Sequence, residues 1–276
     1  MFLYKNWERF CCRLDSIGLH SVCAKEELLN KNNEFLILKH DVETNPKKAL
    51  KLAEIEAKYG HRGSYYVQFY LLKNDHNIKI LKKIQSLGHE VSYHHDVMDS
   101  NSGNIEKAIE NFEENLKIFE KNGFEIKTVC QHGNPIVNRV GYHSNRDFFR
   151  SEIIREKFPE ISEIMVDYKK RIDEQYLYVS DAGYKWKIIF DPENNDVIDS
   201  EDKNITVENL EELICVIQKS RSIIVSTHPH RWHKSAILAV MKNCTFKIIK
   251  NAAKAMLKIR VAKSIMEKFY FLAKKI

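Results

Sequence analysis

The stretch Phe35-Leu-Ile-Leu-Lys-His-Asp-Val-Glu43 is an apolar, strand-like run that ends in a polar cluster, His40 to Glu43. Three other strand-like runs also end in polar clusters. In α/β barrels and open α/β sheets, ligands bind at the carboxyl ends of the strands, so such residues face one shared region. Carboxylates and imidazoles at one rim are typical of a divalent metal site with an acid and a base beside it, which predicts a metal-dependent hydrolase. The other clusters are His89-Glu-Val-Ser-Tyr-His-His-Asp96, Gln131-His-Gly-Asn-Pro135 after Thr128 to Cys130, and Thr227-His-Pro-His-Arg-Trp232 after Ile223 to Ser226.

The rest of the chain alternates strand-like and helix-like segments, which indicates βαβ units and a parallel sheet or barrel. A helix is expected to begin at Pro46, which suits a first helical turn, and to end before Gly60. Another is expected over 207–218 after the cap residue Thr206, whereas 134–172 resembles long irregular loops at the rim. The other expected elements are strands over 35–39, 64–69, 89–93, 126–130, 176–180 and 223–226, and helices over 4–17, 77–87 and 105–122.

Length and composition fit one large α/β domain, with or without a small appendage. The chain has 276 residues, of which 43% are hydrophobic, enough to bury a sizeable core. Charged residues occur too early within Met1 to Arg9 for this segment to be a secretory signal peptide. No later segment has the roughly 18 consecutive apolar residues that a membrane-spanning helix needs. The six cysteines show neither C-x-x-C spacing nor a framework pattern, as expected of reduced thiols. We therefore expect a cytoplasmic protein.

The positive charge is confined to the C-terminal part of the chain. The net charge is +6, but residues 242–276 contain ten Lys and Arg and one acidic residue, a net of +9, and the remainder carries 34 basic and 37 acidic residues. This distribution disfavours a nucleic-acid partner. We expect a barrel domain over 1–240 and a basic amphipathic helical tail over 241–276. The tail either packs on the barrel with a solvated lysine face or lies in an anionic membrane interface, peripheral to the inner membrane face.

The spacing of the first cluster indicates which of its side chains can act together. Asp41 and Glu43 are two residues apart at a strand end, so both carboxylates can point to one side. One can then bind a metal while the other accepts a proton from water. The alternative is a helix-capping acid, because Asn45 and Pro46 open a helix.

The histidines differ in how specific their settings are. His94 and His95 point to opposite faces of a strand, and the phase of the strand favours His94 for the site. His132 precedes the turn residue Gly133, and His228 ends an apolar strand. A lone histidine is more often a surface or core residue, but four polar clusters at four strand ends are much less expected by chance.

Taken in order, these motifs resemble those of the polysaccharide deacetylase superfamily, the NodB-type carbohydrate esterases of family four. The likeness is to the divergent branch in which H-D-V-D replaces T-F-D-D-G and precedes G-H-E-I-G-x-H, an H-x-P turn, S-D-x-x-G-x-W and an H-P-x-x-W strand end. Each motif is short, so their order and spacing over residues 40–232 carry the resemblance. The matching segments are His40 to Glu43, Gly88 to His94, His132 to Pro135, Ser180 to Trp186 and His228 to Trp232.

The resemblance implies a distorted (β/α) barrel of the polysaccharide deacetylase type and metal-assisted hydrolysis of the C–N bond of an N-acetyl group on a sugar or glycan. Asp41 matches the family's general base, and Glu43 matches its metal-binding acid. His94 matches the first histidine ligand and His228 the histidine that protonates the leaving amine. Asp181 lies near the position of a supporting acid. The implied cofactor is a divalent metal ion, with zinc as the first choice.

Two departures from the family pattern affect the expected metal site. Glu43 stands where aspartate is usual, which lengthens the metal-binding arm by one methylene. Met98 stands where the second histidine of H-x-x-x-H is expected. We expect His132 to supply the missing ligand from the neighbouring strand, with His95 and Asp96 as alternatives.

Three residues are expected to contact the substrate: Trp186 and Trp232 as walls that stack on a sugar, and Asn134 beside them. Buried tryptophans are more often plain core, so this expectation has a structural alternative. Two other functions remain open. One is a carbohydrate-binding relative that has lost turnover, which the absence of a second imidazole ligand would favour. The other is a metal-dependent amidohydrolase that acts on a non-sugar amide.

Overall fold

The computed structural model describes residues 2–30, 34–134, 137–171, 176–181, 184–189, 205–220, 222–237 and 239–240. The predicted basic tail over 241–276 lies outside the described residues. Within the described ranges, no helix combines the length and the apolar character that crossing a membrane requires.

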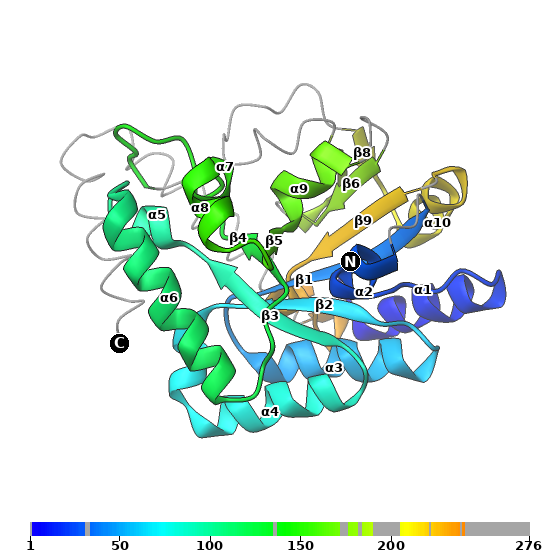
Figure 1. Ribbon diagram of the computed structural model, residues 1–276. Helices are drawn as coiled ribbons and strands as arrows, with labels where there is room; N and C mark the ends of the chain where they lie inside the picture. Colours follow the sequence, from blue (N-terminus) through cyan, green and yellow to red (C-terminus); the bar gives the residue numbers. More distant parts are fainter. Residues whose placement is uncertain are drawn as a thin grey trace.

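One sheet organises the described part of the chain, in the order β5-β4-β3-β2-β1-β9-β6-β7-β8 (Figure 1). The strands from β5 to β6 run parallel, and β7 and β8 extend one edge in antiparallel pairing. This arrangement confirms the predicted α/β class with a mainly parallel sheet. The strands are β1 (Phe35–Val42), β2 (Gly63–Val67), β3 (Glu90–His95), β4 (Thr128–Gln131), β5 (Ser162–Glu163), β6 (Tyr176–Ser180), β7 (Trp186–Ile189), β8 (Ile205–Val207) and β9 (Ser222–Thr227).

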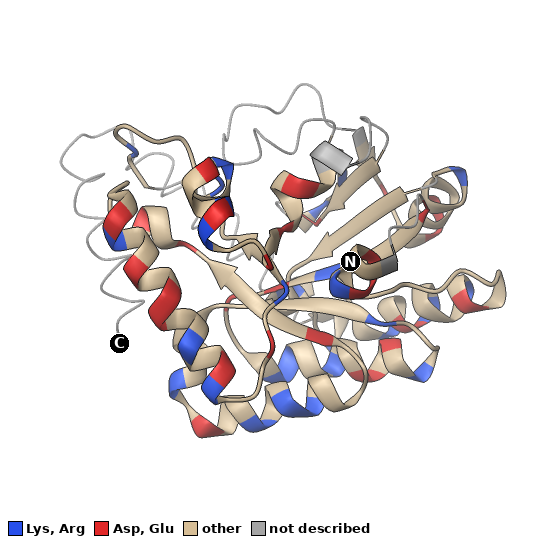
Figure 2. Cartoon of the chain, viewed as in Figure 1, with Lys and Arg blue, Asp and Glu red and all other residues tan. Residues whose placement is uncertain are grey.

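Helices cover the outer face of the sheet, as Figure 1 shows for α3, α4 and α6. Charged residues lie along these helices, whereas the strands carry few (Figure 2). The helix α3 begins at Pro46 as predicted, because the missing N–H of proline is not needed in the first turn. The helices are α1 (Tyr4–Ser16), α2 (Ala24–Asn30), α3 (Pro46–Lys58), α4 (Asp75–Ser86), α5 (Val97–Ser100), α6 (Ile105–Lys121), α7 (Asp147–Arg150), α8 (Glu152–Lys157), α9 (Ile164–Arg171) and α10 (Leu210–Lys219), with the 3-10 turns η1 (Phe69–Lys73) and η4 (Pro229–Arg231).

The sheet curves around an inner apolar cluster. Along β1, Leu36 and Leu38 pack outward into a core shared with helices, while Ile37 packs inward. Cys130 of β4 and Tyr178 of β6 belong to the same inner cluster, although the strands β3, β2, β1 and β9 lie between them in the sheet. The two ends of the parallel sheet therefore approach each other, which is the curvature of a distorted barrel.

Two sequence-based predictions of local structure are wrong. Thr206 does not cap α10, because it lies in β8 opposite Lys187. The cap is Asn209, whose side chain accepts a hydrogen bond from the N–H of Glu212 at 3.0 Å. Residues 134–172 are not only loops, since they include α7, α8, β5 and α9. These elements are two to eight residues long, too short to show a periodic pattern in the sequence.

A buried polar network lies on the outer face of the sheet, between α1, α3 and β1. The carboxylate of Glu56 accepts hydrogen bonds from Trp7 Nε1 at 2.9 Å and Tyr65 OH at 2.8 Å, and it lies 2.9 Å from His40 Nε2. Burial alone would raise the pKa of Glu56, but His40, His89 and these donors hold it below its usual value. His40 therefore belongs to the core and not to the rim site.

We expect Glu56→Ala to lower the free energy of unfolding by about 3–5 kcal/mol, because it leaves buried donors and an imidazole without their carboxylate. The matched control is Glu54→Ala in the same helix. Among the described residues, Glu54 forms ion pairs with the exposed Lys51 and Lys83, so its loss should cost less than about 1 kcal/mol. Urea unfolding measures both, and equal effects would contradict the role assigned to the network.

Candidate metal centre and acid–base groups

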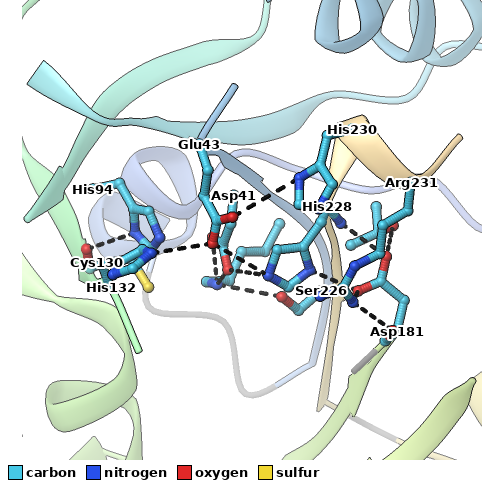
Figure 3. Close-up of polar contacts among 12 residues, drawn as sticks. Asp41, Glu43, His94, Cys130, His132, Asp181, Ser226, His228, His230 and Arg231 are labelled. Atoms are coloured by element: carbon cyan, nitrogen blue, oxygen red, sulfur yellow. Dashed lines mark hydrogen bonds and ion pairs between the residues drawn. The ribbon is translucent and has the colours of Figure 1, made fainter. Parts of the chain in front are cut away.

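Five parallel strands carry polar side chains at one rim of the sheet, and Figure 3 shows these side chains close together. Each of these side chains lies at the carboxyl end of its strand or directly after it, as expected for ligand-binding residues of an α/β fold. Contacts of 2.6–3.8 Å link most of them to one another. The residues are Asp41 from β1 and Glu43 directly after it, His94 from β3, His132 after β4, Asp181 after β6 and His228 after β9.

The neighbouring strand fixes the ring of His94, which faces the inner side of the sheet. Its Nδ1 lies 3.0 Å from the backbone carbonyl oxygen of Cys130. Because a carbonyl only accepts, Nδ1 donates the proton and Nε2 keeps its lone pair. Burial lowers the pKa of His94 to about 3, so the ring is neutral at neutral pH. A neutral imidazole of fixed tautomer is the form that ligates a metal.

Glu43 and His132 form a three-residue group with His94. Glu43 Oε1 lies 3.3 Å from His132 Nε2, and one donor atom from each of the three residues lies within 4.8 Å of the others. Two ligands of one tetrahedral zinc ion are about 3.4 Å apart, so the Glu43–His132 spacing matches such a site. The backbone of His132 is held by hydrogen bonds, since its N–H donates to the carbonyl of His95 at 2.7 Å and its carbonyl accepts from Asn145 Nδ2 at 2.8 Å.

The chemistry of these three side chains suits a divalent metal. Two imidazoles and one carboxylate are the protein ligands of known types of catalytic zinc site, which keep a fourth position open. Burial alone would raise the pKa of Glu43, but His132, His228 and His230 hold it well below its usual range, so the carboxylate is ionised. The residues present therefore fit the divalent ion that the sequence predicts.

Asp41 lies beside this group but has a different partner. Both of its carboxylate oxygens lie 2.6 Å from Nζ of the buried Lys39, and Oδ2 lies 3.8 Å from His228 Nε2. Burial alone would raise the pKa of Asp41, but Lys39, His94 and His228 hold it below its usual value. Asp41 is therefore ionised and able to accept a proton. With His94 and Cys130 it also forms a second group of possible donors within 4.8 Å of one another.

Asp181 orients His228. The carboxylate oxygen Oδ1 lies 2.6 Å from His228 Nδ1, and Oδ2 accepts from the backbone N–H of His228 at 2.9 Å. Burial alone would raise the pKa of Asp181, but Arg231 and His228 hold it far below its usual range. Because an ionised carboxylate only accepts, Nδ1 of His228 carries a proton. The other ring nitrogen, Nε2, lies 3.8 Å from both Asp41 and Glu43.

Three further residues belong to the site and were not predicted from the sequence: Lys39, His230 and Arg231. His230 Nδ1 lies 3.9 Å from Glu43 Oε2, and burial lowers the pKa of His230 to about 4, so it adds a neutral imidazole at the edge of the site. Lys39 has the same strand phase as Asp41, a pattern that could have revealed it. Lysine is almost never fully buried unless it is paired, so the residue type alone does not predict a place in this site.

The expected substrate walls are core residues. Trp186 and Trp232 are 6% and 1% exposed, and both pack with Trp7 in the outer core. Neither ring is open to a sugar, so the expectation that they stack on substrate does not fit this structure. Asn134 is also buried, and its backbone carbonyl accepts a hydrogen bond from Arg139 Nη2 at 3.0 Å.

The alternative ligands lie outside both donor groups. His95 points to the outer face of β3, where its ring contacts Phe112, Phe148 and Phe149. Neither His95 nor Asp96 belongs to a possible metal-binding group among the described residues. The alternation of side chains along β3 therefore selects His94 and sends its neighbour into the core.

No protein-family model and no curated protein sequence matches the chain. The solved structures that resemble it include peptidoglycan deacetylase PdaC from Bacillus subtilis and a mutant of that enzyme. The identities are 12% and 11% and the TM-scores 0.37 and 0.36, with 83% of this chain and 98% of the other chain covered. At such values the likeness supports no argument about activity or substrate.

We expect His94→Ala to reduce bound divalent metal from one ion per chain to a small fraction and to leave the fold intact, because it removes a ligand at a strand end. The matched control is His95→Phe, which alters the adjacent outward-facing residue and should leave the metal content unchanged. Elemental analysis of dialysed protein gives the metal content, and circular dichroism checks the fold. Full metal content in His94→Ala would rule out the assignment.

Acid should destabilise the protein partly through His95. Burial lowers its pKa to about 3, against about 6.5 in an unfolded chain. Between these values the folded chain binds fewer protons than the unfolded chain, so the free energy of unfolding falls as the pH drops below about 6.5. We expect His95→Phe to flatten this fall between about pH 6.5 and 4, measured by urea unfolding, whereas His76→Gln, at an exposed position, should not. The same slope in His95→Phe and the unmodified protein would count against this view.

Proposed function

We propose that the protein is a metal-dependent hydrolase that removes an N-acetyl group from a sugar or glycan. The observation that carries the proposal is the placement of Glu43, His94 and His132 beside two acid–base groups, Asp41 and His228. A site for a divalent ion, an ionised carboxylate and an oriented imidazole at one rim are the parts that hydrolysis of an amide needs.

The side chains divide the proton transfers between them. When bound to Glu43, His94 and His132, a divalent ion such as zinc supplies Lewis acidity toward a carbonyl and lowers the pKa of water. Asp41 is the base that takes the proton of the attacking water, since it is ionised and outside the proposed ligand set. His228 donates a proton from Nε2 to the leaving amine, and the ionised Asp181 on Nδ1 stabilises the charged ring.

That the substrate is a sugar is inferred from the order of the sequence motifs over residues 40–232. That the reaction is hydrolysis of an amide is inferred from the residues of the site. Two other candidates therefore stay in the test. A carbohydrate-binding relative would hold metal without turnover. An amidohydrolase of other specificity would release acid from non-sugar amides but not from N-acetylated sugars.

We expect Asp41→Asn to lower the turnover rate by about 10²–10⁴-fold and to keep the metal, because it removes the base and none of the three proposed ligands. Glu43→Gln should lose metal first and activity as a consequence. The assay is acetate release from N-acetylglucosamine oligomers by the metal-loaded protein, beside a panel of simple N-acetyl amides. Thermal unfolding is followed for Asp41→Asn, because that change leaves Lys39 without its carboxylate.

The outcomes separate the candidate functions. Reversed effects of the two variants, with metal lost in Asp41→Asn and kept in Glu43→Gln, would exchange the roles of the two acids. One bound ion per chain with no acetate release from any substrate would favour the binding relative. Release from simple amides alone would favour the other amidohydrolase.

A further inference from the structure

We infer that Lys39 is a positioning residue: its ammonium group occupies the second donor group, keeps Asp41 and Cys130 from binding the metal, and confines the ion to Glu43, His94 and His132. This inference rests on the proposed metal site. It explains why the ion would bind to Glu43, His94 and His132 and not to the overlapping group of Asp41, His94 and Cys130.

The surroundings of Lys39 are those of a built-in cation. The side chain is 2% exposed, and Nζ lies 2.6 Å from both oxygens of Asp41 and 3.3 Å from Ser226 Oγ. Burial alone would lower the pKa of Lys39, but Asp41 holds it well above its usual value, so the group is charged. A buried charge without a partner is costly, which explains why the ammonium stays against this carboxylate.

The two donor groups compete for one residue. Both include His94, and its free Nε2 can serve a single ion. The group with Asp41 and Cys130 is fully buried and contains a thiol, a type of ligand that zinc binds well, whereas Glu43 is only partly buried. Without a further constraint, the buried group would be an attractive alternative site.

Lys39 removes that alternative by charge and by position. Its ammonium contacts both Asp41 oxygens, so a divalent ion bound to Asp41 would lie close to a second cation and would share its carboxylate. Among the described residues, Glu43 instead pairs with His132, His228 and His230. Asp41 consequently remains available to accept a proton.

Cobalt binding tests the inference without an activity assay, because thiolate ligation gives Co²⁺ an intense charge-transfer absorption band in the near ultraviolet. The unmodified protein should bind Co²⁺ without this band. Lys39→Met, which keeps the length of the stem and removes the charge, should gain the band. The double variant Lys39→Met with Cys130→Ala should lose it again.

A second variant keeps the test decisive if Lys39→Met does not fold. Cys130→Ala alone keeps the backbone carbonyl that holds His94, so its metal affinity should stay within about 2-fold of the unmodified protein. A loss beyond the roughly 10–100-fold typical of residues around a site would make Cys130 a ligand and overturn the inference. A thiolate band in the unmodified protein, or one bound Co²⁺ without the band in Lys39→Met, would also overturn it. If the unmodified protein binds no metal, the proposed metal site itself fails.

Discussion

The register of the parallel strands around β1 is the constraint on which the site depends. Lys39 lies opposite Ser226 of β9, and the same phase carries Asp41 to the inner face. A slip by one residue would reverse every side chain of the strand. The apolar residues of β1 occur on both faces and would not prevent such a slip. The buried polar groups do, because His40 needs Glu56 outside the sheet and Asp41 needs Lys39 inside it.

The inner face of the sheet changes from apolar to polar along the strands. On β1, Ile37 belongs to the inner apolar cluster and is followed inward by Lys39 and Asp41. On β9, Ile224 belongs to the same cluster and is followed by Ser226. The polar groups therefore form a layer above the inner apolar cluster. Little water reaches this layer, so each charged group is stable only when another protein group pairs with it.

Within this layer, the two carboxylates at the end of β1 have different surroundings. Asp41 is paired with an ammonium group, whereas Glu43 faces imidazoles. Such a difference in surroundings is how neighbouring carboxylates acquire different pKa values and different chemistry in general. In the same way, Arg231 and His228 lower the pKa of Asp181 and keep its carboxylate ionised. The carboxylate in turn fixes the tautomer of His228.

The sequence by itself determined the α/β class, most of the strands and long helices, and the residues at the strand ends, because period-two and helical patterns and their Pro and Gly boundaries are local. It also ranked His94 above His95, since the phase of a strand is a local property. Tertiary structure alone decided that Lys39 lies against Asp41, that His132 reaches Glu43 and that Trp232 belongs to the core. The first depends on the burial of this face of β1, because only burial holds the ammonium group against the carboxylate two residues away. The other two depend on packing between strands and helices that are distant in the sequence, which no pattern within one segment records.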